Sequence, residues 1–398
     1  MVYNMTYFNR LPEIGSGIPG IATTATLYVS PEGSNTDGKT WATAYTTIQA
    51  ALTAASTDAD ECTAIIIGPH ATNYDISTTG DPTWTGNYHI MRSHRLWAPV
   101  KNTHASATSV MKFTGQAAIQ NLAIFTQGTV DGVIFTADGW RVRECGFNSS
   151  GTSGATTSVY IDGSGALTKG GIMEDVQFVG NPAYAKAIHI NQSTINEFRY
   201  VHIHDCLTGI HIVDADSDKN LFEDVDIGDC DNGSGIGIDI DAGNEQHFKN
   251  IGFHHNTKNV DDEVGDHVWE GVHGQFPIEI IPGDLDGAAM TTGDAAAGIE
   301  ADWGSAYTFV AADSEEGPYR IVGVHVEPAD SDWYELRFSA DSGSTYYDRI
   351  LFTGGKREGQ AAPSGTEYIF NAKTELYAEA RNESGGDGVN VWIEIQRI

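Results

Sequence analysis

Histidine and acidic side chains recur at equivalent positions of short apolar segments in the middle of the chain, and such groups can exchange protons with a substrate. One set stands one residue before the end of its segments, and the other stands between two isoleucines. The sets are Gln177, His202 and Asp226, and His189, His211 and Asp239. Glycosidases use carboxyl pairs about 5–5.5 Å apart for retention and about 6.5–9.5 Å apart for inversion. The acid–base candidates are therefore Asp226, His202, Asp239 and His211, although solvated side chains of an acidic surface explain the same pattern.

The segments that carry these residues form a repeat. Their starts and ends are Asn121–Ile124, Glu144–Phe147, Asp175–Phe178, Tyr200–Ile203, Asp224–Ile227 and Asn250–Phe253. Successive segments lie 23 to 31 residues apart, which is the period of a solenoid. Apolar residues alternate with a period of two, as in strands, and Phe198, Phe222 and Phe248 recur in phase with them. These patterns predict a parallel β-helix, with an all-β sandwich as the alternative.

A cap for the first coil precedes the repeat. Residues 47–55 have helical periodicity, and Tyr28, Val29 and Trp41 come shortly before them. Together these features resemble the entry module of the pectate-lyase-like right-handed parallel β-helix superfamily, of the kind found in tailed-virus spike and decoration proteins. The resemblance covers about residues 26–270. It implies the fold and says little about activity, because one fold hosts many functions.

Two enzyme families of that superfamily have signatures that can be checked. Asp261-Asp262 matches one element of the polygalacturonase-like hydrolases, but their Gly-His-Gly and Arg-Ile-Lys elements are missing. Arg199 is the one arginine in the later coils, and no calcium-binding carboxylate pattern of a pectate lyase accompanies it. The sequence therefore leans against an enzyme, without deciding the question.

The charge of the chain restricts its partners. The formal net charge is −32 over 398 residues. Nucleic acids and anionic membranes attract basic surfaces, so neither is an expected partner. No run of 18 apolar residues and no secretory signal is seen, which favours either a trimmed chain or a protein released with a virion. High acidity suits ordinary solubility or adaptation to high salt.

Three regions are predicted. Residues 1–25 are rich in glycine and proline and form an extended anchoring arm, and residues 26–272 form the β-helix. Residues 276–398 carry wider-spaced strands that predict an antiparallel, jelly-roll-like β-sandwich. Aromatic side chains are dense there and supply candidate binding platforms, although most of them suit a core. The candidates are Trp303, Trp333, Tyr334, Tyr346 and Tyr347.

Metal sites and cysteine pairing are weaker signals. Alternating oxygen ligands at Asp214, Asp216, Asp218 and Asn220 resemble a calcium loop, but Lys219 replaces its glycine. Calcium is the one cofactor considered at that loop. Adjacent His254 and His255 could bind a transition metal only at a corner, because neighbouring strand residues point to opposite faces. Cys206 and Cys230 occupy equivalent positions, which suits stacked buried thiols or a disulfide.

The sequence thus predicts a structural virion surface protein of a tailed virus, in the form of a capsid- or tail-associated spike or decoration protein. We expect a homotrimer that contacts capsid or tail proteins through its arm and binds a host-surface glycan. Two alternatives stay open: a polysaccharide lyase or glycoside hydrolase, and an extracellular adhesin.

Overall fold

The computed structural model describes the chain in segments. They are residues 23–68, 74–76, 83–92, 98–104, 106–126, 128–149, 156–181, 185–274, 278–281, 288–291, 293–294, 306–310, 318–328, 333–339, 346–353, 358–361, 369–371, 374, 376–382 and 388–398; within them, the side chains of 92, 278–294, 327–328, 333–334, 346–361, 382 and 388 are not described. Two compact units divide at residues 259 and 260. The predicted arm, residues 1–25, lies almost wholly outside the described residues.

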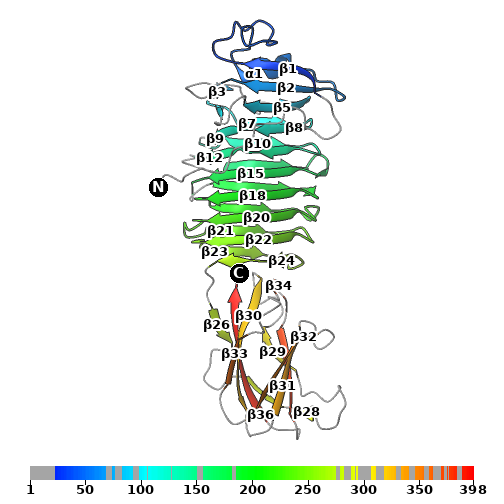
Figure 1. Cartoon of the computed structure of the whole chain (residues 1–398), viewed down its shortest axis with the longest axis vertical. Helices are drawn as coiled ribbons and strands as arrows, with labels where there is room; N and C mark the ends of the chain where they lie inside the picture. The colour runs from blue at the N-terminus through cyan, green and yellow to red at the C-terminus, as the bar shows by residue number, and fades with distance from the viewer. Residues whose placement is uncertain are drawn as a thin grey trace. The chain divides into compact units, whose positions relative to one another are not determined.

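The first unit, together with the strands that follow it up to residue 274, forms a right-handed parallel β-helix, so the predicted fold class is confirmed. Its strands stack coil on coil in two large parallel sheets and one small one (Figure 1). The 15-stranded sheet contains β1 (Thr23–Val29), β2 (Cys62–Ile67), β3 (Tyr74–Asp75), β5 (Asn87–Arg92), β6 (Ala98–Lys101), β8 (Ala117–Gln120), β9 (Leu122–Thr126), β11 (Arg141–Arg143), β12 (Gly146–Ser149), β15 (Ile172–Val179), β18 (Glu197–His204), β20 (Leu221–Gly228), β22 (His247–His254), β24 (Val268–Glu270) and β25 (His273–Gly274). The eight-stranded sheet contains β4 (Thr83–Trp84), β7 (Ser109–Phe113), β10 (Asp131–Phe135), β13 (Thr156–Asp162), β16 (Ala185–Asn191), β19 (Thr208–Ile212), β21 (Ile236–Ile240) and β23 (Lys258–Asp262), and β14 (Thr168–Lys169) pairs with β17 (Ser193–Thr194).

The interior of the β-helix consists of columns of like side chains, because each coil places the same position of the repeat inward. Phe198, Phe222 and Phe248 lie opposite one another in the register of β18, β20 and β22. Their ring centroids are 4.7 and 5.0 Å apart and all three are fully buried. The repeat therefore builds its core by stacking identical residues at the spacing of neighbouring strands.

Six coils of the 15-stranded sheet bend at the first residue of their apolar segment. These residues have φ between 50° and 56°, and the pairing of the strands passes over them. They are Asn121, Glu144, Asp175, Tyr200, Asp224 and Asn250. Asparagine and aspartate tolerate this left-handed conformation better than other side chains, which explains four of the six.

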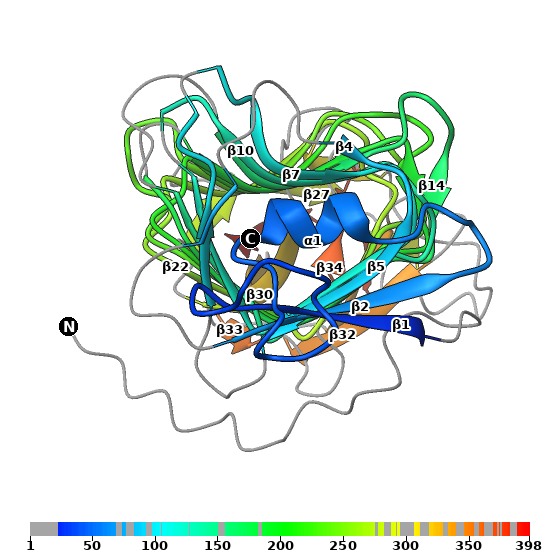
Figure 2. The ribbon, with the colours of Figure 1, turned by 90° about the horizontal axis from the view of Figure 1, so that it is seen from above.

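One end of the β-helix is covered by α1 (Ile48–Ala54), the predicted cap. Thr47 caps this helix, with its side chain accepting a hydrogen bond from the amide of Ala50. Seen from above, α1 lies across the end of the coils, beside β1 and β2 (Figure 2). Its buried face is made of Ile48, Ala51 and Leu52, which close the apolar interior.

The second unit has two mainly antiparallel sheets, which fit the predicted sandwich. One contains β26 (Ile278–Ile281), β27 (Ala288–Thr291), β30 (Tyr319–Pro328), β33 (Glu358–Ala361), β34 (Ile369–Phe370) and β36 (Gly388–Arg397), and the other contains β28 (Gly293–Asp294), β29 (Tyr307–Val310), β31 (Trp333–Ser339), β32 (Tyr346–Thr353) and β35 (Leu376–Asn382). Val324 and Ile393 of the first sheet share one buried cluster with Leu336 and Ala378 of the second. The two sheets therefore enclose a common core.

The four cysteines are free and buried. Burial raises the pKa of the Cys230 thiol to about 12 and that of Cys206 well above its ordinary value. Both thiols are therefore neutral and unreactive in the folded chain.

Candidate functional site

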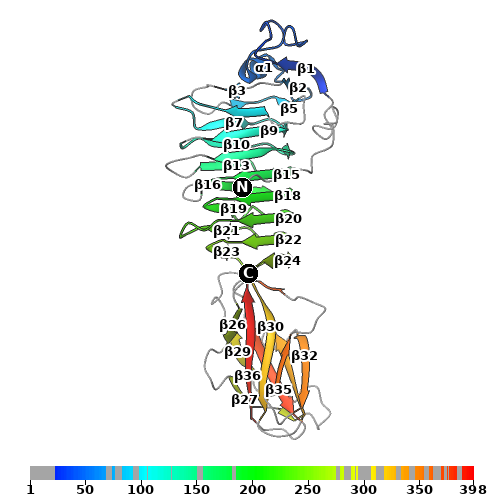
Figure 3. The same cartoon turned by 60° about the vertical axis from the view of Figure 1, so that its left-hand side comes forward.

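A column of polar and aromatic side chains crosses the outer face of the eight-stranded sheet. Tyr160 of β13, His189 of β16, His211 of β19 and Asp239 of β21 lie opposite one another in the strand register. The strands that carry the column stack along one side of the β-helix (Figure 3). The rings of Tyr160 and His189 meet edge to face at 4.7 Å, and those of His189 and His211 at 4.9 Å. Sequence counting predicts three members of this column; Tyr160 extends it by one coil.

His211 is the centre of a compact hydrogen-bonded group. Lys186 Nζ lies 2.6 Å from its Nδ1, and Asp241 Oδ2 lies 3.0 Å from its Nε2. Because an ammonium group can only donate, Nδ1 accepts from Lys186 and the Nε2–H donates to Asp241. Asp239 Oδ2 is 3.5 Å from the same Nε2. One oxygen of each carboxylate lies within 4.8 Å of the other, so two acids and a base surround one imidazole.

Burial sets the electrostatics of this group. The His211 side chain is 9% exposed. Desolvation lowers the pKa of Lys186, while Asp239 and Asp241 act in the opposite direction. Desolvation is the main cause that lowers the pKa of His189 to about 4. The column therefore presents a neutral imidazole beside the hydrogen-bonded Lys186–His211–Asp241 group, and such groups can hydrogen-bond a substrate and exchange a proton with it.

The depressed pKa of His189 predicts a loss of stability in mild acid. Because its pKa in the folded chain lies near 4 rather than 6.5, only the unfolded chain takes up this proton between those values. The contribution of His189 to the free energy of unfolding is complete above pH 6.5 and falls by up to about 1.4 kcal/mol per pH unit towards pH 4. The groups that face His189 are Tyr160, Asp162, Lys186, His211 and Asp241.

Urea unfolding at pH 7 and pH 5 tests this assignment. In His189→Gln, the difference in unfolding free energy between the two pH values should shrink by roughly 1–2 kcal/mol. The exposed His273→Gln serves as the control and should leave the difference unchanged. An unchanged difference in His189→Gln contradicts the buried neutral imidazole.

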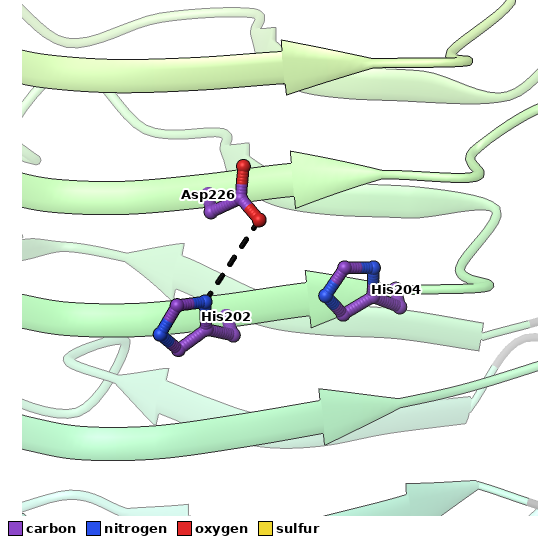
Figure 4. A group of neighbouring side chains, drawn as sticks. All are labelled: His202, His204 and Asp226. Atoms are coloured by element: carbon purple, nitrogen blue, oxygen red, sulfur yellow. Dashed lines mark ion pairs between the residues drawn. The ribbon is translucent and has the colours of Figure 1, made fainter. Parts of the chain in front are cut away.

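A second group lies on the outer face of the 15-stranded sheet. His202 and His204 of β18 point to the same side, and Asp226 of β20 lies opposite His202 with Nδ1 and Oδ2 3.8 Å apart (Figure 4). Gln177 occupies the preceding coil in the same register. The imidazole of His202 lowers the pKa of Asp226, and burial lowers the pKa of His204. The structure thus places Asp226 and His202 together, on a different sheet from Asp239 and His211.

The second group also contains His254 and His255, which the sequence admits as metal ligands only at a corner, and it adds His204 and Asp229 to the predicted residues. His254 Nδ1 is 3.5 Å from Asp226 Oδ1, and the Asp229 carboxylate oxygens lie 3.9 Å from His204 Nδ1 and 3.3 Å from His255 Nδ1. His255 has a φ of 52°, so the chain turns a corner there and brings the rings of His254 and His255 within 5.7 Å. The sequence signal for this convergence is the spacing of two between His202 and His204, together with the corner residues Asp205 and Asp229.

The residues of the proposed calcium loop take other roles. Asn220 is fully buried and hydrogen-bonds Asn196 and Gln246 of neighbouring coils. Asp214 accepts from the amide of Asp216, and Asp218 accepts from the amide of Asn244. Calcium binding at this corner stays a prediction.

The side chains of the proposed aromatic platforms lie outside the part of the chain that the structure describes. Trp303 lies outside the described residues. The backbones of Trp333 and Tyr334 belong to β31 and those of Tyr346 and Tyr347 to β32, while their side chains are among those not described.

Among the described residues, no helix is long and apolar enough to cross a membrane.

Comparison with known proteins finds similarity in fold. No protein-family model matches the sequence, and no curated protein matches it. Pantoea stewartii WceF, a glycan biofilm modifying enzyme with a bacteriophage tailspike-like parallel β-helix fold, matches at 10% identity over 84% of this chain and 50% of its own, with a TM-score of 0.28. The enzymatically active domain of tailspike protein 4 of bacteriophage CBA120 matches at 10% identity over 85% of this chain and 64% of its own, with a TM-score of 0.19. A tailspike double mutant of E. coli bacteriophage HK620 matches at 9% identity over 85% of this chain and 82% of its own, with a TM-score of 0.31.

This chain spans half the length of the WceF structure and about two thirds of the CBA120 domain. At these identities the similarity concerns the fold alone.

Proposed function

We propose that this chain is a spike-type surface protein that binds a polysaccharide on the outer face of its eight-stranded sheet. The observation that supports this function is the column of Tyr160, His189, His211 and Asp239, which offers ring edges and hydrogen-bonding groups on four successive coils. Sugars present hydroxyl groups and apolar faces, and mixed aromatic and polar surfaces bind both. A net charge of −32 disfavours polyanionic chains, so a neutral polysaccharide is the expected class.

The same site supports cleavage of the bound glycan as a second function. Asp239 and Asp241 bring carboxylate oxygens within 4.8 Å of each other beside His211. Such closeness is nearer to the spacing of a retaining glycosidase than to the roughly 6.5–9.5 Å of an inverting one. In that role one carboxyl group, protonated before the reaction, would give its proton to the leaving oxygen while the other carboxylate bonds to the anomeric carbon; water would then release the sugar and return the proton, and His211 would hold both carboxyl groups in place.

A panel of neutral polysaccharides tests both functions. We expect saturable binding by isothermal titration calorimetry, weakened at least tenfold in the Tyr160→Ala, His189→Ala double variant because two ring contacts are lost. If the chain also cleaves the polysaccharide, reducing ends are released, and this release should disappear in Asp239→Asn. The matched control is Asp226→Asn on the other sheet, which should bind and cleave like the unmodified chain. Equal binding by the double variant and the unmodified chain contradicts this site.

Virion attachment and trimerisation belong to the same proposal. The parallel β-helix and the candidate arm at residues 1–25 support them. We expect flanking genes to encode capsid or tail proteins, and sedimentation of the full chain to give the mass of three copies. A monomeric protein whose gene lies among metabolic genes contradicts virion attachment and trimerisation. Glycan binding is tested separately by the calorimetric titrations.

A further inference from the structure

The second group of histidines owes its geometry to a glycine. His204, Gly228 and His254 lie in one register column of β18, β20 and β22. The two histidines stand two strands apart, which places their backbones about 9.6 Å from each other. Their ring centroids are nevertheless 5.3 Å apart. The rings come together because His254 leans over Gly228, where an added Cβ would overlap its imidazole.

Carboxylates complete the surroundings of this pair. Asp229 Oδ2 is 3.9 Å from His204 Nδ1, and Asp226 Oδ1 is 3.5 Å from His254 Nδ1. One donor atom each of His204, Asp229 and His254 lies within 4.8 Å of the other two. Two donors held about 2.0–2.2 Å from one tetrahedral ion are roughly 3.4 Å apart, so a small contraction brings these atoms to coordination distance.

We infer that His204, Asp229 and His254 form a binding site for a divalent transition-metal ion such as Zn²⁺, with Asp226 as the neighbouring carboxylate. Two imidazoles and a carboxylate suit zinc and its first-row neighbours, whereas calcium and magnesium prefer oxygen ligands alone. The ion joins β18, β20 and β22 across three coils. It therefore adds a cross-link to the β-helix, and stability rises with metal concentration because only the folded chain assembles the site.

The three proposed ligands are accessible from outside the β-helix. The side chains of His204, Asp229 and His254 are 24%, 41% and 35% exposed, so an ion can reach them from solvent.

Titration of the full, tag-free and chelator-treated chain tests the site. Zn²⁺ should bind with a stoichiometry of one per chain by calorimetry, Co²⁺ should give visible absorption bands of a low-symmetry centre, and the melting temperature should rise with either ion. His204→Ala should weaken binding at least roughly tenfold. The exposed His273→Ala is the matched control and should bind like the unmodified chain.

Gly228→Ala is the decisive variant, because it keeps every ligand and removes only the space over which His254 leans. Circular dichroism should show an intact fold, since the obstructed group is the end of a side chain, while Zn²⁺ affinity falls at least tenfold. Absence of saturable binding overturns the site. Binding kept in His204→Ala and Gly228→Ala but lost in His211→Ala also overturns it, because the ion would then lie on the eight-stranded sheet.

Discussion

Phe222→Ala is expected to lower the free energy of unfolding by about 3–5 kcal/mol. The ring is fully buried and stacks between Phe198 and Phe248 at 4.7 and 5.0 Å, nearly parallel to both. Truncation leaves a cavity with a phenylalanine on each side, and the strands that carry these neighbours are fixed by their own backbone pairing. The cavity can therefore collapse only slightly, which places the cost high in the range for such substitutions.

Equilibrium unfolding in guanidinium, followed by circular dichroism, measures this effect. Phe125→Ala on β9 is the matched control, because its ring is on a half-buried position of the same sheet. We expect the control to lose about 1 kcal/mol or less. A loss below 1 kcal/mol in Phe222→Ala would mean that the column of rings contributes little to the core.

The stacked interior was predictable because it repeats a residue type at a fixed interval. Phe198, Phe222 and Phe248 follow the coil period, and counting along the sequence places them opposite one another, as the register confirms. The bends in the coils were harder to predict from the sequence. Asp224 and Asn250 are residues that favour the left-handed region, but Tyr200 adopts the same conformation at φ 54° only because its neighbours in the stack impose it.

The positions of side chains on the outer faces of the β-helix are not predicted correctly by strict alternation along each strand. Strict alternation assigns His189 and His211 to one column, but it puts Lys186, three residues before His189, on the opposite face. The pairing of β16 with β19 passes over Ala187, which shifts the alternation and lets Lys186 reach His211. The approach of His254 to His204 likewise depends on the absence of a side chain at Gly228. This approach could not be predicted from the residue pattern.

Asn220→Ala is expected to cost about 3 kcal/mol or more, because this buried side chain links three coils. Its Oδ1 accepts from the amide and the side chain of Asn196, at 3.0 and 2.8 Å. Its Nδ2 donates to Gln246 Oε1 at 3.0 Å and to the carbonyl of Ser193 at 3.2 Å. Alanine removes these partners at a position without solvent access, and each buried polar group that loses its partner costs about 1–3 kcal/mol.

Asn220→Leu separates the two contributions to this cost, because leucine fills the volume and makes none of the hydrogen bonds. If the hydrogen bonds dominate, the leucine variant unfolds at a guanidinium concentration as low as the alanine variant does; recovery in the leucine variant would show that volume matters more. Asn232→Ala, at an exposed corner, is the control and should change stability by less than about 0.5 kcal/mol. Loss in both buried variants implies that the corners directly before β18 and β20, which hold Asn196 and Asn220, keep their shape through polar side chains.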